Sequence, residues 1–179
     1  MHAIRLRVFT ALLPDPVACQ WLQRQLPTAW PDDLRPVPRA NWHLTLHFHG
    51  GLSPAQVEAL IHRLDRLDCP AVPPLRTHAW LDLPQDRPSA RVLSLSDDHE
   101  SLEGLRAALP AAGQAAAERR PFLPHITVGR YRRGRRAPAW PAPPPADIRL
   151  PRLALLESRS TTAGVVYRPL WQRPLSVSA

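Results

Sequence analysis

Lysine is absent from this 179-residue sequence, so every one of its 23 basic side chains is an arginine. We attribute this uniformity to genomic base composition rather than to function. Only two cysteines are present, Cys19 and Cys69, which is too few for a disulfide framework or a cysteine zinc site. This usage suits a reducing compartment, and we expect a cytoplasmic protein. Long hydrophobic runs are also missing. The apolar stretch near the N-terminus soon reaches Pro14, so neither a signal peptide nor a membrane span is expected.

The composition predicts a folded, basic domain. Hydrophobic residues make up 44% of the chain, which is enough for a packed core and argues against disorder. A chain of this length forms one domain or two small lobes with a shared core, and we treat residues 1–179 as a single bilobal domain. The net charge of +8 and the isoelectric point of about 11.2 favour an anionic partner such as nucleic acid.

The hydrophobic pattern predicts an α+β protein. Helices are predicted over residues 17–26, 54–67 and 97–109, and Asp15 and Ser53 are start signals for the first two. Strands are predicted over residues 4–13, 34–38, 42–48, 75–83, 90–96, 122–131, 150–158 and 164–175. Gly50 and Gly51 are expected to end the third of these strands. Residues 132–146 are rich in arginine, proline and alanine and predict an irregular basic loop.

Two similar strings, His43-Leu44-Thr45-Leu46 and His125-Ile126-Thr127-Val128, lie 82 residues apart in two of the predicted strands. Because alternate residues of a strand face opposite sides, each string places its histidine and threonine on one face and its apolar residues on the other. Each string follows a strand–helix–strand stretch, which indicates two halves related by a pseudo-twofold axis. We therefore expect two antiparallel sheets with helices on their outer faces and a central cleft where the strings meet.

These residue types suit acid–base chemistry on a phosphate. Phosphodiester cleavage needs a base for the attacking oxygen and an acid for the leaving oxygen, and an imidazole with a pKa of about 6.5 can be either. Threonine hydroxyls can donate hydrogen bonds to the non-bridging oxygens. The strings thus predict His43 and His125 as catalytic residues and Thr45 and Thr127 as substrate-binding residues, with no metal or cofactor required.

Other residues leave alternatives open. By alternation, His47 and His49 share the face of His43, where they extend the floor of the cleft as solvated or RNA-facing side chains or form a three-histidine metal face. The metal alternative is disfavoured because residues i and i+4 of a strand lie about 13 Å apart. Phe122 either stacks on a terminal base or packs against its lobe. The arginines of residues 132–136 either grip backbone phosphates or are simply solvated.

The chain resembles the two-histidine phosphoesterases, and among them the bacterial RNA 2′,3′-cyclic phosphodiesterases, formerly called 2′-5′ RNA ligases. The resemblance extends over nearly the whole chain and is carried by five segments: Arg5–Phe9, Arg35–Gly50, Arg91–Leu95, Pro121–Arg130, and Leu155–Ser158 followed by Tyr167. The chain departs from the family pattern at Trp42, His49 and Gly129, and none of these departures affects the histidine and threonine pairs.

The resemblance implies a bilobal α+β fold with a positively charged cleft that hydrolyses a terminal 2′,3′-cyclic phosphate on RNA to a 2′-phosphomonoester. In that family's terms, His43 is the general acid for the 3′ leaving oxygen, His125 is the base that activates water, and Thr45 and Thr127 hold the phosphate. Arg130 follows the second string and would contact the substrate. Strict alternation puts Arg130 on the face opposite His125, so this role needs a bulge or a long reach.

Two other functions remain compatible with the sequence. One is 2′-5′ RNA ligation, in which a 5′-hydroxyl end replaces water as the nucleophile. The other is an RNA-binding module that has kept the cleft but not turnover, although the presence of both histidines and both threonines favours an enzyme. The expected partner is RNA with a 2′,3′-cyclic phosphate end or a small cyclic nucleotide. We expect no membrane association and a monomer.

Overall fold

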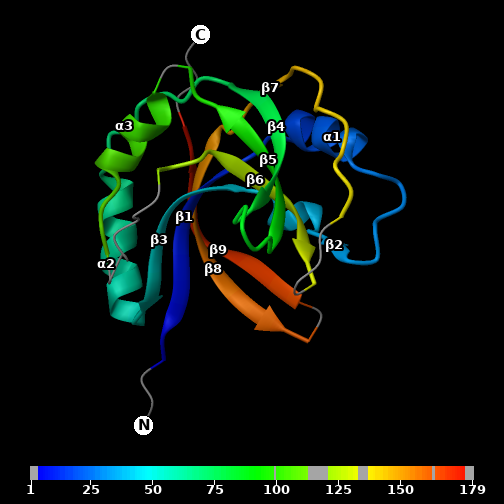
Figure 1. Ribbon diagram of the computed structural model, residues 1–179. Coiled ribbons are helices and arrows are strands. Elements are labelled where there is room, and N and C mark those ends of the chain that lie inside the picture. Colours follow the sequence, from blue (N-terminus) through cyan, green and yellow to red (C-terminus); the bar gives the residue numbers. More distant parts are fainter. Residues whose placement is uncertain (1–3, 99, 113–120, 133–136, 163, 176–179) are drawn as a thin grey trace.

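The computed structural model describes residues 4–98, 100–112, 121–132, 137–162 and 164–175 (Figure 1). The helices are α1 (Pro16–Gln25), α2 (Pro54–Asp65), α3 (Ser101–Ala108) and the short 3-10 helix η1 (Arg39–Asn41). The strands are β1 (Leu6–Leu13), β2 (Leu34–Pro36), β3 (Leu44–Leu52), β4 (Leu75–Leu83), β5 (Ala90–Ser96), β6 (His125–Tyr131), β7 (Asp147–Ile148), β8 (Arg152–Thr161) and β9 (Gly164–Pro174). The predicted α+β class is confirmed.

The strands form one antiparallel sheet, in the order β7-β4-β5-β6-β3-β1-β8-β9, and β2 pairs with β6 outside this path. Strands β3 and β6 lie beside one another through the single residue pair Leu44–Ile126. The prediction of two separate sheets is therefore wrong in this detail, because all the strands belong to one continuous sheet. Alternation along a strand indicates which face is buried, but it does not indicate which strand pairs with its edge.

Helices α2 and α3 lie together on one side of the molecule, and α1 lies on the other (Figure 1). The predicted start signals are confirmed: the side chain of Asp15 accepts a hydrogen bond from the Ala18 amide, and Ser53 forms a capping box with Gln56. Helix α3 begins at Ser101, later than predicted. The carboxylate of Asp97 still accepts a hydrogen bond from a backbone amide of this helix, that of Leu102, at 2.7 Å.

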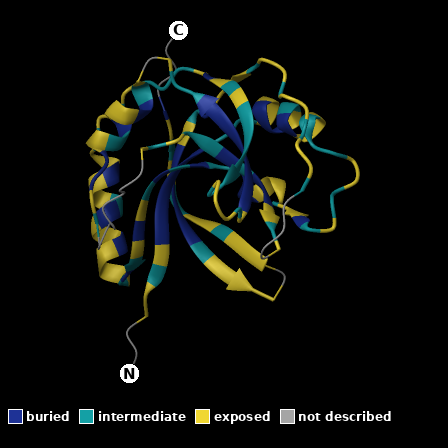
Figure 2. Cartoon of the chain, in the orientation of Figure 1, coloured by how far each residue is buried: buried dark blue, intermediate teal, exposed yellow. Residues whose placement is uncertain are grey.

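The core lies between the sheet and its helices, and Figure 2 shows buried residues along both the strands and the helices. The apolar residues of both strings belong to it and are at most 1% exposed: Leu44, Leu46, Ile126 and Val128. The histidines and threonines of the strings are only half-buried. The alternation predicted for the two strings is thus confirmed. No helix in the described part of the chain is long and apolar enough to span a membrane.

Strand β3 contains two irregularities in its pairing with β1. Thr10 pairs with His47 while Ala11 pairs with Thr45, so Leu46 is an extra residue, and a second shift leaves His49 extra between Phe48 and Gly50. The strand therefore continues to Leu52, and the prediction that the two glycines end it is wrong. Gly50 adopts a φ of 74°, a conformation that glycine reaches at little cost, and it serves the bulge instead of a turn.

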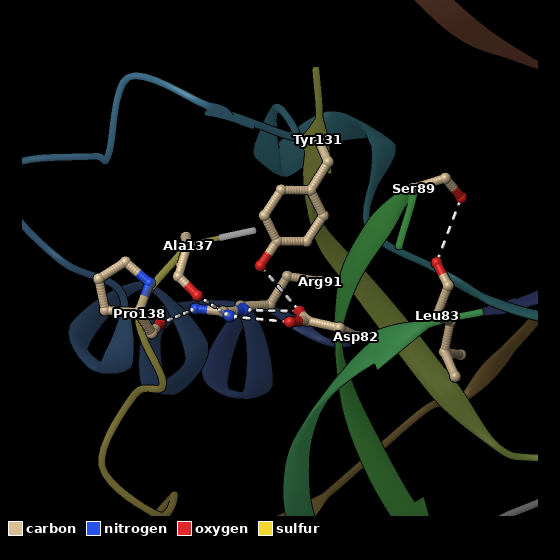
Figure 3. Close-up of polar contacts among 7 residues, drawn as sticks. All are labelled: Asp82, Leu83, Ser89, Arg91, Tyr131, Ala137 and Pro138. Carbon is tan, nitrogen blue, oxygen red and sulfur yellow. Dashed lines mark hydrogen bonds and ion pairs between the residues drawn. The ribbon is translucent and has the colours of Figure 1, made fainter. Parts of the chain in front are cut away.

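A buried arginine fixes the described end of the basic segment against the sheet (Figure 3). Arg91 of β5 is 3% exposed and donates to both carboxylate oxygens of Asp82, at 2.9 and 3.1 Å. It also donates to the carbonyl oxygens of Pro138, at 2.7 Å, and Ala137, at 3.2 Å. The Tyr131 hydroxyl completes the cluster by donating to Asp82 at 2.9 Å. Of the arginines that would either grip phosphates or be solvated, those at residues 133, 135 and 136 lie outside the described residues.

Candidate active site

The two catalytic candidates lie on either side of the Leu44–Ile126 pair. His43 immediately precedes β3, and His125 is the first residue of β6. Because these strands are antiparallel, the two strings run in opposite directions about that pair. His43 and His125 are therefore diagonal neighbours across this pair, and such neighbours lie about 7–8 Å apart. The structure brings together the two residues that the sequence places 82 positions apart.

Each histidine is anchored in the same way. Nδ1 of His43 lies 2.7 Å from the carbonyl oxygen of Asn41, and Nδ1 of His125 lies 2.7 Å from that of Leu123. A carbonyl can only accept a hydrogen bond, so Nδ1 carries the proton in both rings. In the neutral form, Nε2 is then the atom that can accept a proton. The Thr45 hydroxyl lies 3.1 Å from Nε2 of His43 and donates to it.

The half-buried faces of both strings line one cleft with a volume of about 490 Å³. His43, Thr45, His125 and Thr127 all contribute to its wall, as the alternation predicted. Other cleft residues come from β4, β5 and β6 and from β1, β3, β8 and β9, and the last four strands contribute Arg7, Phe9, Phe48, Ser158 and Tyr167. The site is thus a polar centre with an aromatic wall on one side.

Burial lowers the pKa of both imidazoles. The pKa of His43 falls from 6.5 to about 4, mainly through desolvation, while the Asn41 carbonyl opposes the fall and the charges of His125 and Arg130 add to it. Desolvation also lowers the pKa of His125, and Arg130 lowers it further. Both rings are therefore neutral at pH 7 when the cleft holds no anion. A bound phosphate would favour the protonated forms and counteract these shifts.

Arg130 lines the cleft because β6 contains a bulge. Arg91 pairs with Gly129, whereas Val92 pairs with Thr127, so Val128 is the extra residue. The shift turns Arg130 to the side of the histidines. Contact between Arg130 and the substrate was expected to need a bulge, and the bulge is present. Residue 129, beside the bulge, has to be a glycine because a Cβ atom there would lie 2.8 Å from a methyl carbon of Leu34.

His47 and His49 do not line the cleft, so the expectation that they share its face with His43 is wrong. The extra residue Leu46 reverses the alternation, and His49 is 1% exposed, with Nε2 2.8 Å from the Thr10 hydroxyl. The three-histidine metal face fails for the same reason. Among the described residues, no cluster of three or more histidine, cysteine or acidic side chains is arranged to hold a metal ion.

Phe48, which alternation would bury, is the residue that the bulges expose. It is 59% exposed, lines the cleft, and lies with its ring centroid 5.8 Å from that of Phe9. Phe122, by contrast, was expected near the substrate. It does not line this cleft but packs against the core, with the Arg106 guanidinium 3.8 Å from its ring centroid, and its stacking on a terminal base stays a prediction.

Asn41 is a site residue that the sequence did not indicate. Its carbonyl holds His43, its Nδ2 donates to the Val165 carbonyl at 2.7 Å, and its Oδ1 accepts from the Tyr167 amide at 3.4 Å. Strand β9 is thereby tied to the loop that carries His43, and the Tyr167 ring packs 4.9 Å from the imidazole. The partners of the Asn41 side chain are backbone atoms more than 120 residues away in the chain, and such contacts leave no sequence motif.

Comparisons with known proteins agree with this geometry. The model of the LigT-like phosphoesterase family matches residues 15–76, which contain the first string. Apo LigT from E. coli superposes with a TM-score of 0.68 at 25% identity, over 96% of this chain and 98% of that chain. TT0787 of Thermus thermophilus has a TM-score of 0.68 at 26% identity, over 97% of this chain and 100% of that chain. The family match and these structural neighbours support the two-histidine phosphoesterase superfamily.

The structural likeness covers 96% of this chain and so extends well beyond the segment that the family model matches. E. coli LigT complexed with 3′-AMP is similar to the same extent, with a TM-score of 0.68 at 25% identity over 96% of this chain and 99% of that chain. Comparison with curated proteins gives no match.

Proposed function

We propose that this phosphoesterase hydrolyses a terminal 2′,3′-cyclic phosphate on RNA to a 2′-phosphomonoester by two-histidine acid–base catalysis. One observation carries the proposal. Both imidazoles are anchored through Nδ1 on a carbonyl, and both line a cleft shared with two threonines and Arg130. Such a site has a proton acceptor, a proton donor and hydrogen-bond donors for an anion in one place.

The reaction divides between the two rings. Nε2 of His125 removes a proton from water as the water oxygen attacks phosphorus, and the bond between phosphorus and the 3′ oxygen breaks. His43, protonated on Nε2, gives its proton to that oxygen, which leaves as the 3′ hydroxyl. The phosphate remains on the 2′ oxygen. The neutral His125 that this step requires agrees with the lowered pKa, and the bound anion raises the pKa of His43 towards its working range.

The threonines and Arg130 stabilise the charge that builds on the non-bridging oxygens. Hydroxyl and guanidinium groups are donors, and charge-assisted bonds from a guanidinium to phosphate are strong. Phe48 offers an exposed aromatic face beside these groups, on which the base of the terminal nucleotide can stack. The complex of LigT with 3′-AMP supports a nucleotide as the ligand class.

The test is incubation of an oligonucleotide that ends in a 2′,3′-cyclic phosphate, with identification of the product isomer. The variants are His43→Ala and His125→Ala, and His62→Ala, an exposed histidine on α2, is the matched control. We expect a 2′-phosphate from the wild type and the control with or without EDTA. Each site variant should lose activity by at least about 100-fold.

Other outcomes separate the alternatives. A 3′-phosphate product would refute the assigned leaving group, and full activity in either site variant would remove that histidine from the mechanism. When an RNA with a 5′-hydroxyl end is added, a joined product in excess over hydrolysis would favour the ligase. Tight binding of the oligonucleotide without turnover would identify a binding module instead.

A further inference from the structure

The cleft continues along β1 beyond the catalytic centre. On the cleft face of this strand, Ala11 lies opposite Thr45, Phe9 lies opposite Phe48, and Arg7 lies opposite Gly51. A strand rises about 3.4 Å per residue, so Phe9 is about 7 Å and Arg7 about 13 Å along β1 from the level of the catalytic threonine. The cleft therefore leads from the acid–base groups, past two aromatic rings, to a guanidinium group.

The surroundings of Arg7 suit an anion. Arg7 is exposed, and no carboxylate of the described residues forms an ion pair with it. The nearby carboxylate of Glu157 has its own partners, since Arg159 and Arg168 approach it at 3.0 and 3.7 Å. Ser158 lines the same end of the cleft, because the pairing of Val8 with Glu157 brings the next residue of β8 to the level of Arg7.

We propose that Arg7, assisted by the Ser158 hydroxyl, forms a second phosphate subsite. It binds the phosphoryl group on the 5′ side of the nucleotide whose cyclic phosphate occupies the catalytic centre. This inference rests on the proposed function and refines its substrate class. A guanidinium can bind two phosphate oxygens in parallel, and a hydroxyl can donate to a third. Nucleotides with a 5′ phosphoryl group are then preferred over nucleosides that carry only the cyclic phosphate.

The position of Arg7 also predicts how the subsite acts. At about 13 Å along the strand from the catalytic threonine, its guanidinium is too far from the reacting phosphorus to contact it. An interaction of this kind is equally strong in the ground state and the transition state, so it lowers KM and leaves kcat unchanged. A lower KM without a change in kcat distinguishes a subsite from a further catalytic residue.

Three substrates distinguish the possible sources of the 5′ phosphoryl group. They are a nucleoside 2′,3′-cyclic phosphate, its 5′-phosphorylated form, and a dinucleotide that ends in a 2′,3′-cyclic phosphate. For Arg7→Gln we expect KM to rise about tenfold on the second and third substrates, to change less than about twofold on the first, and kcat to stay constant. Arg24→Gln, which removes an exposed arginine from the last turn of α1, should match the wild type on all three.

Binding provides a readout that does not depend on turnover. Titration calorimetry with adenosine 2′-monophosphate and with adenosine 2′,5′-bisphosphate measures the contribution of the 5′ phosphate alone. Arg7→Gln should weaken the bisphosphate about tenfold and leave the monophosphate unchanged. If the variant weakens both ligands equally, or neither, the subsite is refuted. If the wild type hydrolyses none of the three substrates but the selective loss of binding is present, the subsite stands and the proposed reaction fails.

Discussion

Two imidazoles with strongly lowered pKa values, the half-buried His43 and the buried His49, make the stability of this fold depend on pH. Burial lowers the pKa of His49 from 6.5 to about 4, the charge of His47 lowers it further, and the Ala112 carbonyl opposes the change. His43 has a pKa of about 4 for similar reasons. In the unfolded chain both rings regain a pKa of about 6.5.

Proton linkage determines whether acid stabilises or destabilises the fold. Between pH 6.5 and about 4 the unfolded state binds protons that the folded state does not, so acidification favours unfolding. The stabilisation is complete above about pH 6.5 and is lost as the pH falls towards 4. The change in pKa corresponds to about 3 kcal/mol for each histidine at pH 4. Together the two rings account for about 6 kcal/mol, a large part of the 5–15 kcal/mol that is typical of a domain.

The experiment isolates His49, which lies outside the cleft. His49→Gln replaces it with a side chain that does not titrate and can still bond to the Thr10 hydroxyl. Urea unfolding followed by tryptophan fluorescence gives the free energy of unfolding at several values between about pH 7.5 and about pH 4.5. We expect the wild type to lose stability over this range and the variant to lose about 2.5 kcal/mol less, the share of one such histidine. His62→Gln on α2 is the control and should follow the wild type.

Two results would refute this reasoning. The first is a free energy of unfolding that stays constant in the wild type between about pH 7.5 and about pH 4.5. The second is a His49→Gln variant whose pH dependence equals that of the wild type, which would mean that burial does not keep the His49 ring neutral in the folded state.

Further predictions concern the catalytic centre and the buried ion pair. Because the pKa values of both His43 and His125 lie below 6.5 in the free enzyme, kcat/KM should fall about tenfold per pH unit above neutrality as the singly protonated form is depleted. The limb of kcat should lie at higher pH, and a kcat/KM that is constant or rises between about pH 7 and 9 would contradict the assignment. Asp82→Asn should cost about 3 kcal/mol in urea unfolding, because Arg91 remains buried without a counter-charge. Asp147→Asn breaks an exposed pair and should cost less than about 0.5 kcal/mol; equal losses would refute a special role for burial.

Much of the architecture follows from local sequence features. The strands over residues 75–83 and 90–96 have the predicted bounds, because alternation and flanking turn residues act locally. The caps at Asp15 and Ser53 were likewise predictable, since a helix N-terminus needs an acceptor within a few residues. Alternation within the two strings likewise predicted which of their side chains face away from the core.

The bulges could not be predicted from local sequence features. Simple alternation assigns His47 and His49 to the cleft and Phe48 to the core, and one extra residue at Leu46 reverses all three. A bulge depends on how two strands fit against one another, so it is a property of the pair and not of either segment. The same cause brings Arg130 into the cleft through the extra residue Val128.

The sequence by itself determined that two strands present a histidine and a threonine on their polar faces, because that periodicity is a property of any extended chain. Only the tertiary structure decided that both histidines border one cleft, which aromatic ring stands beside them, and that Arg7 lies at the far end. Those facts depend on which strand edges pair and in what register. Pairing is decided by contacts between segments that are distant in the chain, and these contacts carry no local signal.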